Sequence, residues 1–351
     1  MNDKITSGVA RSAGLPGGDK HLFLAWTDFQ RRQISMQGTF GFTIRFMGLP
    51  SANLTIKFIQ YFKLALVTLA ILVRRRPRIV WVQLPPMPLL MVVLTYRAVF
   101  QRDLVVVADC HNGVFRPPWS TWPGLRRMLQ SCNLALIHND SVSREANLLG
   151  LKFQKLLVME DCPATIPEDV TSEFRFESPL VLFPAGFAKD EPVQEIIEAA
   201  RRLPDVTFVL TGRLERAHAN HDLSRIPENL KLTGFLPAHD FNAILTQSDI
   251  VLALTTVEGI QLSACNEAIG AGKPMVLSDT ALLRKLFGDG AIFVQNDADA
   301  IVAGLTLAFK QLRLLSEKVC VLKSRRMEQW LSDQAVPAIQ HLRSISPIVD
   351  Q

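Results

Sequence analysis

The sequence predicts an α/β protein built from two doubly wound, Rossmann-like domains. The first observation is length, because 351 residues suffice for about two domains of ordinary size. The second is a series of short apolar runs, which are typical of strands buried on both faces of a parallel sheet. The third is that segments of helical periodicity separate these runs. This alternation favours parallel strands joined by crossover helices.

Composition favours a reducing compartment. The five cysteines are scattered, without Cys-x-x-Cys pairs or neighbouring histidines, which argues against a disulfide framework or a zinc site. We therefore expect a cytoplasmic protein, at the inner face of a membrane if it meets lipid, and no bound metal. Residues 1–20 are rich in Gly, Ser and Asp and lack the apolar core of a secretory signal. We expect them to form a disordered tail.

Charge is unevenly distributed between the two halves. Residues 1–163 contain 20 Lys and Arg against 9 Asp and Glu, whereas residues 164–351 contain 18 against 24. The basic first half predicts an anionic partner. It contains no aromatic-rich RNA motif and no basic recognition helix, so we expect no nucleic acid partner. Anionic lipid, or an acceptor carrying a lipid phosphate, fits the charge better.

The first predicted strand covers residues 21–26, and polar side chains follow it. In a doubly wound sheet, the loop after the first strand lies at the ligand-binding edge. Arg31 or Arg32 could therefore meet a phosphate, and Asp28 an acceptor hydroxyl; alternatively, these residues begin a solvated helix. No Gly-x-Gly-x-x-Gly motif follows the strand, which argues against a nicotinamide-dependent dehydrogenase.

Residues 54–73 are strongly apolar, but lysines interrupt them and only residues 64–73 are continuously uncharged. This stretch is about half the length that a membrane-spanning helix needs. Arginines follow at residues 74–76. The segment therefore predicts either a helix lying in the headgroup region of a membrane or a packed crossover helix with a solvated basic end.

A second group of polar residues follows a strand predicted at 103–109. Asp109, His111 and Asn112 come at the carboxyl end of this strand, next to a glycine that permits close approach of a ligand. An imidazole or a shielded carboxylate could accept the proton of an acceptor hydroxyl. The alternative is structural: Asp109 caps a turn, and His111 donates to a backbone carbonyl.

Residues 246–279 form the most informative stretch. A buried strand at 250–254 leads through a polar loop to a helix that begins near Ser263, with Glu267 one turn later on the same face. Residues 270–274, Gly-Ala-Gly-Lys-Pro, end the helix. The start of such a helix binds phosphate, and a carboxylate one turn into it can accept hydrogen bonds from a ribose diol. The alternative for Glu267 is a side chain that caps the helix or complements its dipole.

These residues resemble the donor-binding signature of the GT-B glycosyltransferases, in particular their large family-four group. The resemblance covers Glu258-Gly259, Glu267-Ala268, 272–274 and Ser278-Asp279. It implies that Glu267 holds the ribose of a nucleotide sugar and that Glu258 lies near the transferred sugar. Eight residues separate the two glutamates, one more than the family's usual spacing, so Gly259 stands where the first Glu would stand. The donor-binding loop would consist of Gly259, Gln261, Leu262 and Ser263.

The resemblance extends to other loops of both halves. In the second half it implies a diphosphate loop at Gly186 and Lys189, with Arg213 as a further cation and Leu236 beneath the nucleotide base. In the first half, residues 82–86 and 109–112, VQLPP and DCHN, resemble the dolichol-linked chitobiose mannosyltransferase and its bacterial relatives. That likeness implies that Asp109 and His111 face a cleft between the domains and act in catalysis.

The expected organisation follows from these patterns. An N-terminal, acceptor-side Rossmann-like domain covers residues 21–163, and an acidic, proline-containing linker covers 164–179. A nucleotide-sugar-binding domain covers 180–320. In the GT-B enzymes that the chain resembles, two such domains face each other across a cleft. The last segment, 321–351, is then a helix that packs back toward the first domain.

The sequence thus predicts a metal-independent hexosyltransferase that takes a nucleotide diphosphate sugar as donor substrate and needs no other cofactor. The expected acceptor is a glycan or a polyprenyl-diphosphate-linked oligosaccharide in exopolysaccharide or surface-glycan synthesis. Peripheral membrane contact through the basic first domain would suit such an acceptor. Two alternatives stay open: a GT-B sugar-nucleotide epimerase, which needs no separate acceptor, and a non-catalytic subunit that binds a partner transferase or a membrane.

Overall fold

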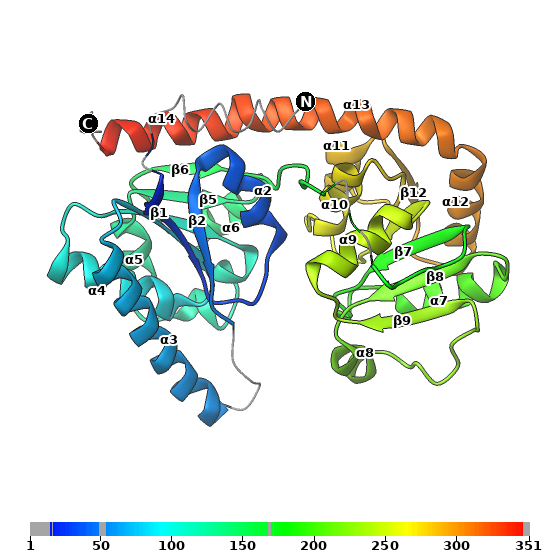
Figure 1. Cartoon of the computed structure of the whole chain (residues 1–351), viewed down its shortest axis with the longest axis horizontal. Helices are drawn as coiled ribbons and strands as arrows, with labels where there is room; N and C mark the ends of the chain where they lie inside the picture. The colour runs from blue at the N-terminus through cyan, green and yellow to red at the C-terminus, as the bar shows by residue number, and fades with distance from the viewer. Residues whose placement is uncertain (1–14, 16, 49–53, 168–169, 171, 347–351) are drawn as a thin grey trace. The chain divides into compact units, whose positions relative to one another are not determined.

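The computed structural model describes residue 15 and residues 17–48, 54–167, 170 and 172–346. These residues form two compact α/β units (Figure 1). The first contains the described residues up to Cys162 and those from Glu328 onward, and the second contains Pro163–Met327. Most of the predicted tail, residues 1–14 and 16, lies outside the described residues.

The first unit is built on a six-stranded sheet in which all neighbouring strands are parallel. The strand order is β2-β1-β3-β4-β5-β6, so the winding direction reverses between β1 and β3. Loops at such a reversal bind ligands in doubly wound sheets. The strands are β1 (Gly18–Ala25), β2 (Phe42–Phe46), β3 (Ile79–Leu84), β4 (Val105–Cys110), β5 (Leu134–Ile137) and β6 (Leu156–Val158). The first strand thus begins at Gly18, three residues earlier than predicted.

Apolar strand residues and the inner faces of the helices make the core of this unit. Val80, Val82, Val106 and Ala108 are fully buried, as expected for central parallel strands. The helices are α2 (Arg31–Phe40), α3 (Leu54–Arg75), α4 (Met87–Phe100), α5 (Leu125–Ser131) and α6 (Asp140–Leu148). Two short 3₁₀ turns, Asn112–Phe115 and Trp119–Thr121, follow β4.

The second unit repeats the architecture. Its sheet has the order β12-β11-β10-β7-β8-β9, again all parallel, with the reversal between β7 and β10. The strands are β7 (Leu180–Pro184), β8 (Thr207–Thr211), β9 (Leu230–Gly234), β10 (Ile250–Ala253), β11 (Met275–Ser278) and β12 (Ala291–Val294). The helices are α7 (Val193–Arg202), α8 (Leu214–Asn220), α9 (Ala238–Gln247), α10 (Ser263–Ala271), α11 (Ala281–Phe287) and α12 (Ala298–Lys310). Two doubly wound parallel sheets confirm the predicted fold class.

The linker and the C-terminal helices connect these units. Among the described residues between β6 and β7 there is no helix or strand, and Ala164 donates its N–H to the carbonyl of Asn266. Gly270 permits this approach, because a Cβ there would lie 2.1 Å from the carbonyl oxygen of Ala164. Helix α13 (Leu312–Trp330) belongs to the second unit up to Met327 and continues through a π-helical turn, Leu331–Ala335, into α14 (Val336–Ile345).

The end of the chain packs on the first unit. The indole of Trp330 donates to the carbonyl of Glu160, and its ring meets Phe40 edge-on at 6.1 Å. A ring nitrogen of His341 lies 3.2 Å from the carbonyl oxygen of Asn133. Helix α13 starts at Leu312, nine residues before the predicted boundary at 321, and is continuous through that position. None of the described helices is long and apolar enough to cross a membrane.

Candidate active site

Helix α10 begins at Ser263, where the sequence predicts it, and ends at Ala271. Gly272 adopts the left-handed conformation of a helix C-cap, with φ 69°. At the other end Leu262 occupies the N-cap position and supplies no side-chain hydrogen bond, and the first turn contains no acidic residue. The first N–H groups of α10 therefore lack a capping side chain. Such a helix start attracts anions through its N–H groups and its dipole.

Two buried amides beside this helix start lack partners. Both polar atoms of the Gln261 side chain, and both of the Asn266 side chain, are buried and form no hydrogen bond within the described chain. Leaving a buried donor or acceptor unsatisfied is costly, so such groups indicate a binding position for a ligand or water. Glu267, one turn into α10, is only 8% exposed. Of the predicted donor-binding residues, Gln261 and Glu267 thus lie at or just after one helix start.

The loops near α10 indicate the same ligand-binding position. Strand β7 pairs with β10 on one side and with β8 on the other, so the loops that follow these three strands lie at the same edge of the sheet. The loop after β10 is tied to the loop after β7, because the hydroxyl of Thr255 donates to Asp190 at 2.6 Å and the N–H of Thr256 donates to the Asp190 carbonyl at 2.8 Å. The winding reversal of the sheet falls between β7 and β10. Ligands bind at this position in open α/β sheets.

Glu258 has a structural role that the sequence analysis did not assign. Its carboxylate accepts the N–H groups of Gly259 at 2.9 Å, Ala281 at 2.9 Å and Leu282 at 3.1 Å. Ala281 and Leu282 are the first residues of α11, so Glu258 caps that helix. The hydrogen bonds from Ala281, Leu282 and Gly259 hold the pKa of Glu258 below its usual range. Its contact with a transferred sugar stays a prediction.

A carboxylate occupies the loop that was expected to bind diphosphate. Glu191 accepts the N–H of Gly186 at 2.9 Å through Oε1, and its Oε2 is buried without a hydrogen-bond partner in the described chain. Burial raises the pKa of Glu191, and the nearby backbone N–H groups, that of Gly186 first, oppose the rise. The Phe187 side chain is buried in the apolar core. The N–H of Gly186 is therefore already paired with a carboxylate in the loop that was expected to bind diphosphate.

The remaining predicted donor residues belong to loops of the second unit and are exposed or half-buried. Lys189 is exposed, and the guanidinium of Arg213 lies 4.9 Å from the ring centroid of Phe235. Leu236 is half-buried against the apolar core. Gly259 has φ 78°, a conformation that favours glycine. Their contacts with a donor stay predictions.

The strongest polar cluster of the first unit surrounds Asp109. This residue is fully buried, and Arg32 donates to it through Nη2 at 3.0 Å and through Nε at 3.2 Å. Arg32 also donates to Asp161 at 2.6 Å and to the carbonyl of Met159 at 2.8 Å. Burial alone would raise the pKa of Asp109, but Arg32 and then His111 hold it well below its usual range. Asp109 is therefore a permanently charged anchor and is poorly suited to act as a base.

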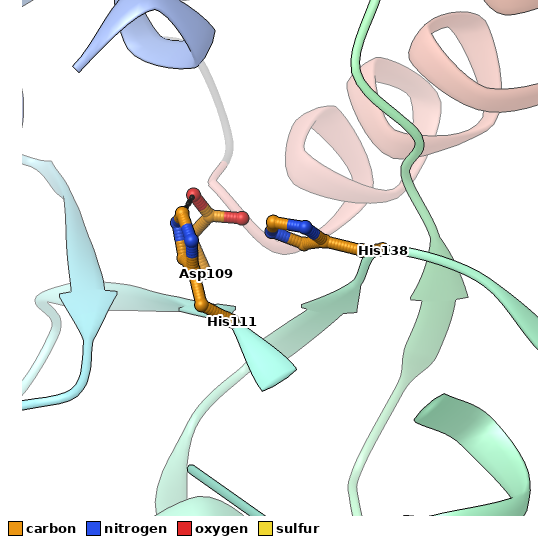
Figure 2. A group of neighbouring side chains, drawn as sticks. All are labelled: Asp109, His111 and His138. Carbon is orange, nitrogen blue, oxygen red and sulfur yellow. Dashed lines mark ion pairs between the residues drawn. The ribbon is translucent and has the colours of Figure 1, made fainter. Parts of the chain in front are cut away.

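His111 lies between this anchor and α2's N-cap residue. Its Nε2 is 3.5 Å from Oδ2 of Asp109, and its Nδ1 is 3.3 Å from the amide nitrogen of Gln30. The His138 ring meets it at a centroid distance of 4.3 Å, and Figure 2 shows the two rings converging beside Asp109. Burial, with Arg32 and His111, lowers the pKa of His138 to about 3. His138 is thus neutral at neutral pH.

His138 is missing from the predicted site. It follows β5, which pairs with β4, so it lies next to the residues that follow β4. The strand-end rule that identified His111 could have identified His138 as well. Asn112, predicted at the same edge, begins a 3₁₀ turn, and its side-chain oxygen is buried without a hydrogen bond in the described chain.

Asp109, His111 and His138 could offer three ligand atoms within 4.8 Å of one another, so a metal ion has to be considered. A cation there would compete with Arg32 for the only carboxylate of the three, since Arg32 donates to both of its oxygens. The carboxylates of Asp297 and Asp299, which are two residues apart in the chain, are also engaged: Asp297 caps α12 and Asp299 pairs with Arg202. Neither arrangement points to a free metal site, and the expectation of metal independence stays a prediction.

Comparisons with known proteins agree with the fold. Residues 168–318 match the family model described as glycosyl transferases group 1. No curated protein matches the chain. Among solved structures, it is similar to Anabaena HepE in complex with UDP-glucose, with a TM-score of 0.61, 12% identity and coverage of 95% of this chain and 97% of that one.

Two further structures show the same architecture. Sucrose-phosphate synthase from Thermosynechococcus elongatus has a TM-score of 0.60 and 13% identity, covering 86% of this chain and 83% of that one. A putative UDP-N-acetylglucosamine 2-epimerase from Listeria monocytogenes has a TM-score of 0.59 and 15% identity, covering 93% and 96%. The chain therefore has the GT-B type of fold. The likeness of its first half to polyprenyl-linked mannosyltransferases stays a prediction.

Proposed function

We propose that this protein transfers a glycosyl group from a nucleotide diphosphate sugar to an acceptor hydroxyl. The observation that carries the proposal is the uncapped start of α10, with the unpartnered amide of Gln261 beside it and the buried Glu267 one turn further on. These residues lie inside the segment that matches the group 1 glycosyl transferase model. Their chemistry suits an anionic diphosphate that carries hydroxyl-rich groups.

The donor would bind with its diphosphate at the N-terminus of α10. The helix start would stabilise the negative charge that develops on the leaving nucleoside diphosphate, which supports a reaction without a metal ion. Glu267 would accept hydrogen bonds from the ribose diol, and Gln261 would bind the diphosphate or the sugar. Because Anabaena HepE is a similar structure in complex with UDP-glucose, uridine is the first base to test.

His111 is the group best suited to accept the acceptor's proton. The anionic Asp109 favours the imidazole form whose proton lies on Nε2, which leaves Nδ1 as the basic nitrogen. Nδ1 faces the Gln30 amide, which an acceptor hydroxyl could displace. In the proposed reaction the acceptor oxygen bonds to the anomeric carbon, the bond from that carbon to the diphosphate breaks, and the hydroxyl proton passes to His111. Asp109 acts as a positioning residue.

The proposed acceptor is a growing glycan, carried on a polyprenyl diphosphate, in exopolysaccharide or surface-glycan synthesis at the cytoplasmic side of a membrane. The excess of Lys and Arg in residues 1–163 supports an anionic acceptor or membrane surface. Such an acceptor would require peripheral contact with the bilayer.

Two other functions have specific observations in their favour. The similarity to the putative epimerase structure favours a reaction on the nucleotide sugar itself. Glu191 already accepts a backbone N–H in the expected diphosphate loop, and Glu258 accepts a backbone N–H at the start of α11. Because both carboxylates have structural partners, they favour a non-catalytic subunit. We rank transfer first, because the start of α10 has no capping side chain and the basic first half suits a separate anionic acceptor.

Release of nucleoside diphosphate distinguishes the three functions. The purified protein is incubated with UDP-, GDP- and ADP-sugars, with and without a membrane extract as the source of acceptor. Transfer predicts release that depends on the extract. Epimerisation predicts an altered sugar without any extract, and a non-catalytic subunit predicts no turnover of any donor. A His111→Ala variant that retains full acceptor-dependent release would remove His111 from the reaction.

A further inference from the structure

Helices α3 and α4 expose an apolar face to solvent. They pack against each other (Figure 1). Phe62 on α3 and Val99 on α4 are each 66% exposed. Among the side chains that the structure describes on the two helices, the other exposed large apolar ones are Ile59, Leu66, Val67 and Val73 on α3, and Met91 and Phe100 on α4. On α3 these positions recur with helical spacing, so they form one stripe along the helix.

The orientation of α3 is fixed by the opposite side of the helix. Thr68 and Leu72 are fully buried, and the indole of Trp26 donates to the Thr68 hydroxyl at 3.0 Å. Tyr61 stacks on Trp26 with a centroid distance of 5.6 Å. A surface helix normally presents polar residues on the side away from the core. Here that side is apolar, and contiguous apolar surface of this kind marks an interaction site.

The segment that contains α3 and α4 is rich in basic residues. Residues 29–102 contain no Asp or Glu and eleven Lys and Arg: Arg31, Arg32, Arg45, Lys57, Lys63, Arg74, Arg75, Arg76, Arg78, Arg97 and Arg102. Lys63 and Arg74 are exposed along the stripe, and Arg76 and Arg78 are exposed just beyond the end of α3. Asp19 pairs with Arg75, and the exposed Asp103 follows α4. The face thus combines apolar side chains with a strong excess of positive charge.

We propose that the face formed by α3 and α4 docks on an anionic lipid bilayer. The two helices would lie in the headgroup region, with their apolar side chains reaching the acyl boundary and their cations on lipid phosphates. No described helix can cross a membrane, so the contact is peripheral. A second copy of the chain fits poorly, because it would place Lys and Arg against Lys and Arg. The docking itself does not depend on the proposed transfer. Its purpose does, because docking would bring the enzyme to a lipid-linked acceptor.

Vesicle co-sedimentation tests the docking without any donor or acceptor. We expect the full chain to sediment with mixed phosphatidylglycerol and phosphatidylcholine vesicles, and to stay in solution with phosphatidylcholine alone. High salt should weaken binding, because it screens the attraction between the protein's cations and the lipid. The double substitution Phe62→Ser, Leu66→Ser should weaken binding about tenfold or more, and Lys63→Glu, Arg74→Glu should do the same.

Matched variants in the second unit control for these changes. Leu314→Ser, Val321→Ser alters two exposed apolar residues of α13, and Lys231→Glu, Lys318→Glu makes the same change of charge at exposed positions. Both controls should bind vesicles as the unaltered protein does. Undiminished binding by the α3 variants, or equal binding to neutral vesicles, overturns the proposal. A dimer in solution that dissociates on the Phe62 and Leu66 changes also overturns it, since a second copy would then cover the face. An α3 variant that loses vesicle binding but still binds the nucleotide sugar shows that the two proposals stand separately. Vesicle binding by a protein that binds no nucleotide sugar would leave the docking intact and remove the transfer.

Discussion

Arg32 and Asp109 form a buried ion pair in which Nη2 lies 3.0 Å from Oδ1 and the side chains are 3% and 0% exposed. The two residues are 77 positions apart in the chain, and the pair joins the start of α2 to the end of β4. Asp161 extends it on the other side of the guanidinium. Because the pair places the Asp109 carboxylate beside His111, it links the stability of the first unit to the proposed catalytic group.

Removing one member of the pair should be strongly destabilising. Arg32→Met leaves the Asp109 charge buried without its main partner, and such losses cost about 3–5 kcal/mol. We expect a decrease of that size in the free energy of unfolding, measured with urea at neutral pH. The double variant Arg32→Met, Asp109→Asn should be less destabilised than the sum of the two single changes. Additive effects would show that the pair is not coupled.

His138 should make the protein less stable in mild acid. Its pKa is lowered to about 3 in the folded state, whereas an unfolded histidine titrates near about 6.5. The unfolded state therefore takes up a proton that the native state does not, and stability falls as the pH falls from about 6.5 toward 3. His138→Gln should flatten this dependence by up to about 1.4 kcal/mol per pH unit. Measuring the free energy of unfolding of both proteins between about pH 4 and pH 7 tests this expectation. Parallel curves for the two proteins would contradict it.

Glu258 should contribute to stability through the start of α11. Glu258→Ala removes hydrogen bonds to three backbone N–H groups, and the loss of a helix cap costs about 1 kcal/mol. Glu258→Gln, which can still accept hydrogen bonds, should be less destabilised. Thermal unfolding of both variants measures this order. A loss of turnover in Glu258→Gln at unchanged stability would instead support the predicted contact with the sugar.

Glu191 should oppose donor binding. Its carboxylate lies in the loop after β7, next to the strand that leads to α10, and like charges close to one another repel. Glu191→Gln keeps an oxygen for the Gly186 N–H and removes the charge. We expect the variant to bind nucleotide diphosphate several-fold more tightly, measured by calorimetry. Unchanged affinity would place the diphosphate away from this loop.

Local patterns in the sequence predicted the strands, their polar ends and the start of α10 at Ser263, because each depends on neighbouring residues. The pairing of Arg32 with Asp109 and Asp161 could not be predicted in this way, since it joins residues that are far apart in the chain. The same holds for Glu258, which caps a helix that begins 23 residues later. Glu191 is closer in the chain, five residues from Gly186, but its hydrogen bond with the Gly186 N–H depends on how the loop folds.

The exposed face of α3 shows a second limit of prediction from the sequence. The sequence left two interpretations of residues 54–73, a membrane-surface helix and a packed crossover helix. The structure contains features of both, because Thr68 and Leu72 pack into the core while Phe62 and Leu66 remain exposed. A hydrophobic stretch alone cannot distinguish these faces when apolar residues occupy both sides of the helix.

The central claim is that a nucleotide diphosphate sugar binds at the start of α10, beside Glu267. The most direct measurement is the thermal shift of the protein with UDP-, GDP- and ADP-sugars, because a ligand that binds the native state raises its melting temperature. We predict a shift with at least one donor, its loss in Glu267→Gln at a retained fold, and its retention in the matched control Glu228→Gln, an exposed residue of the same unit. A donor shift of the same size in Glu267→Gln would contradict the account.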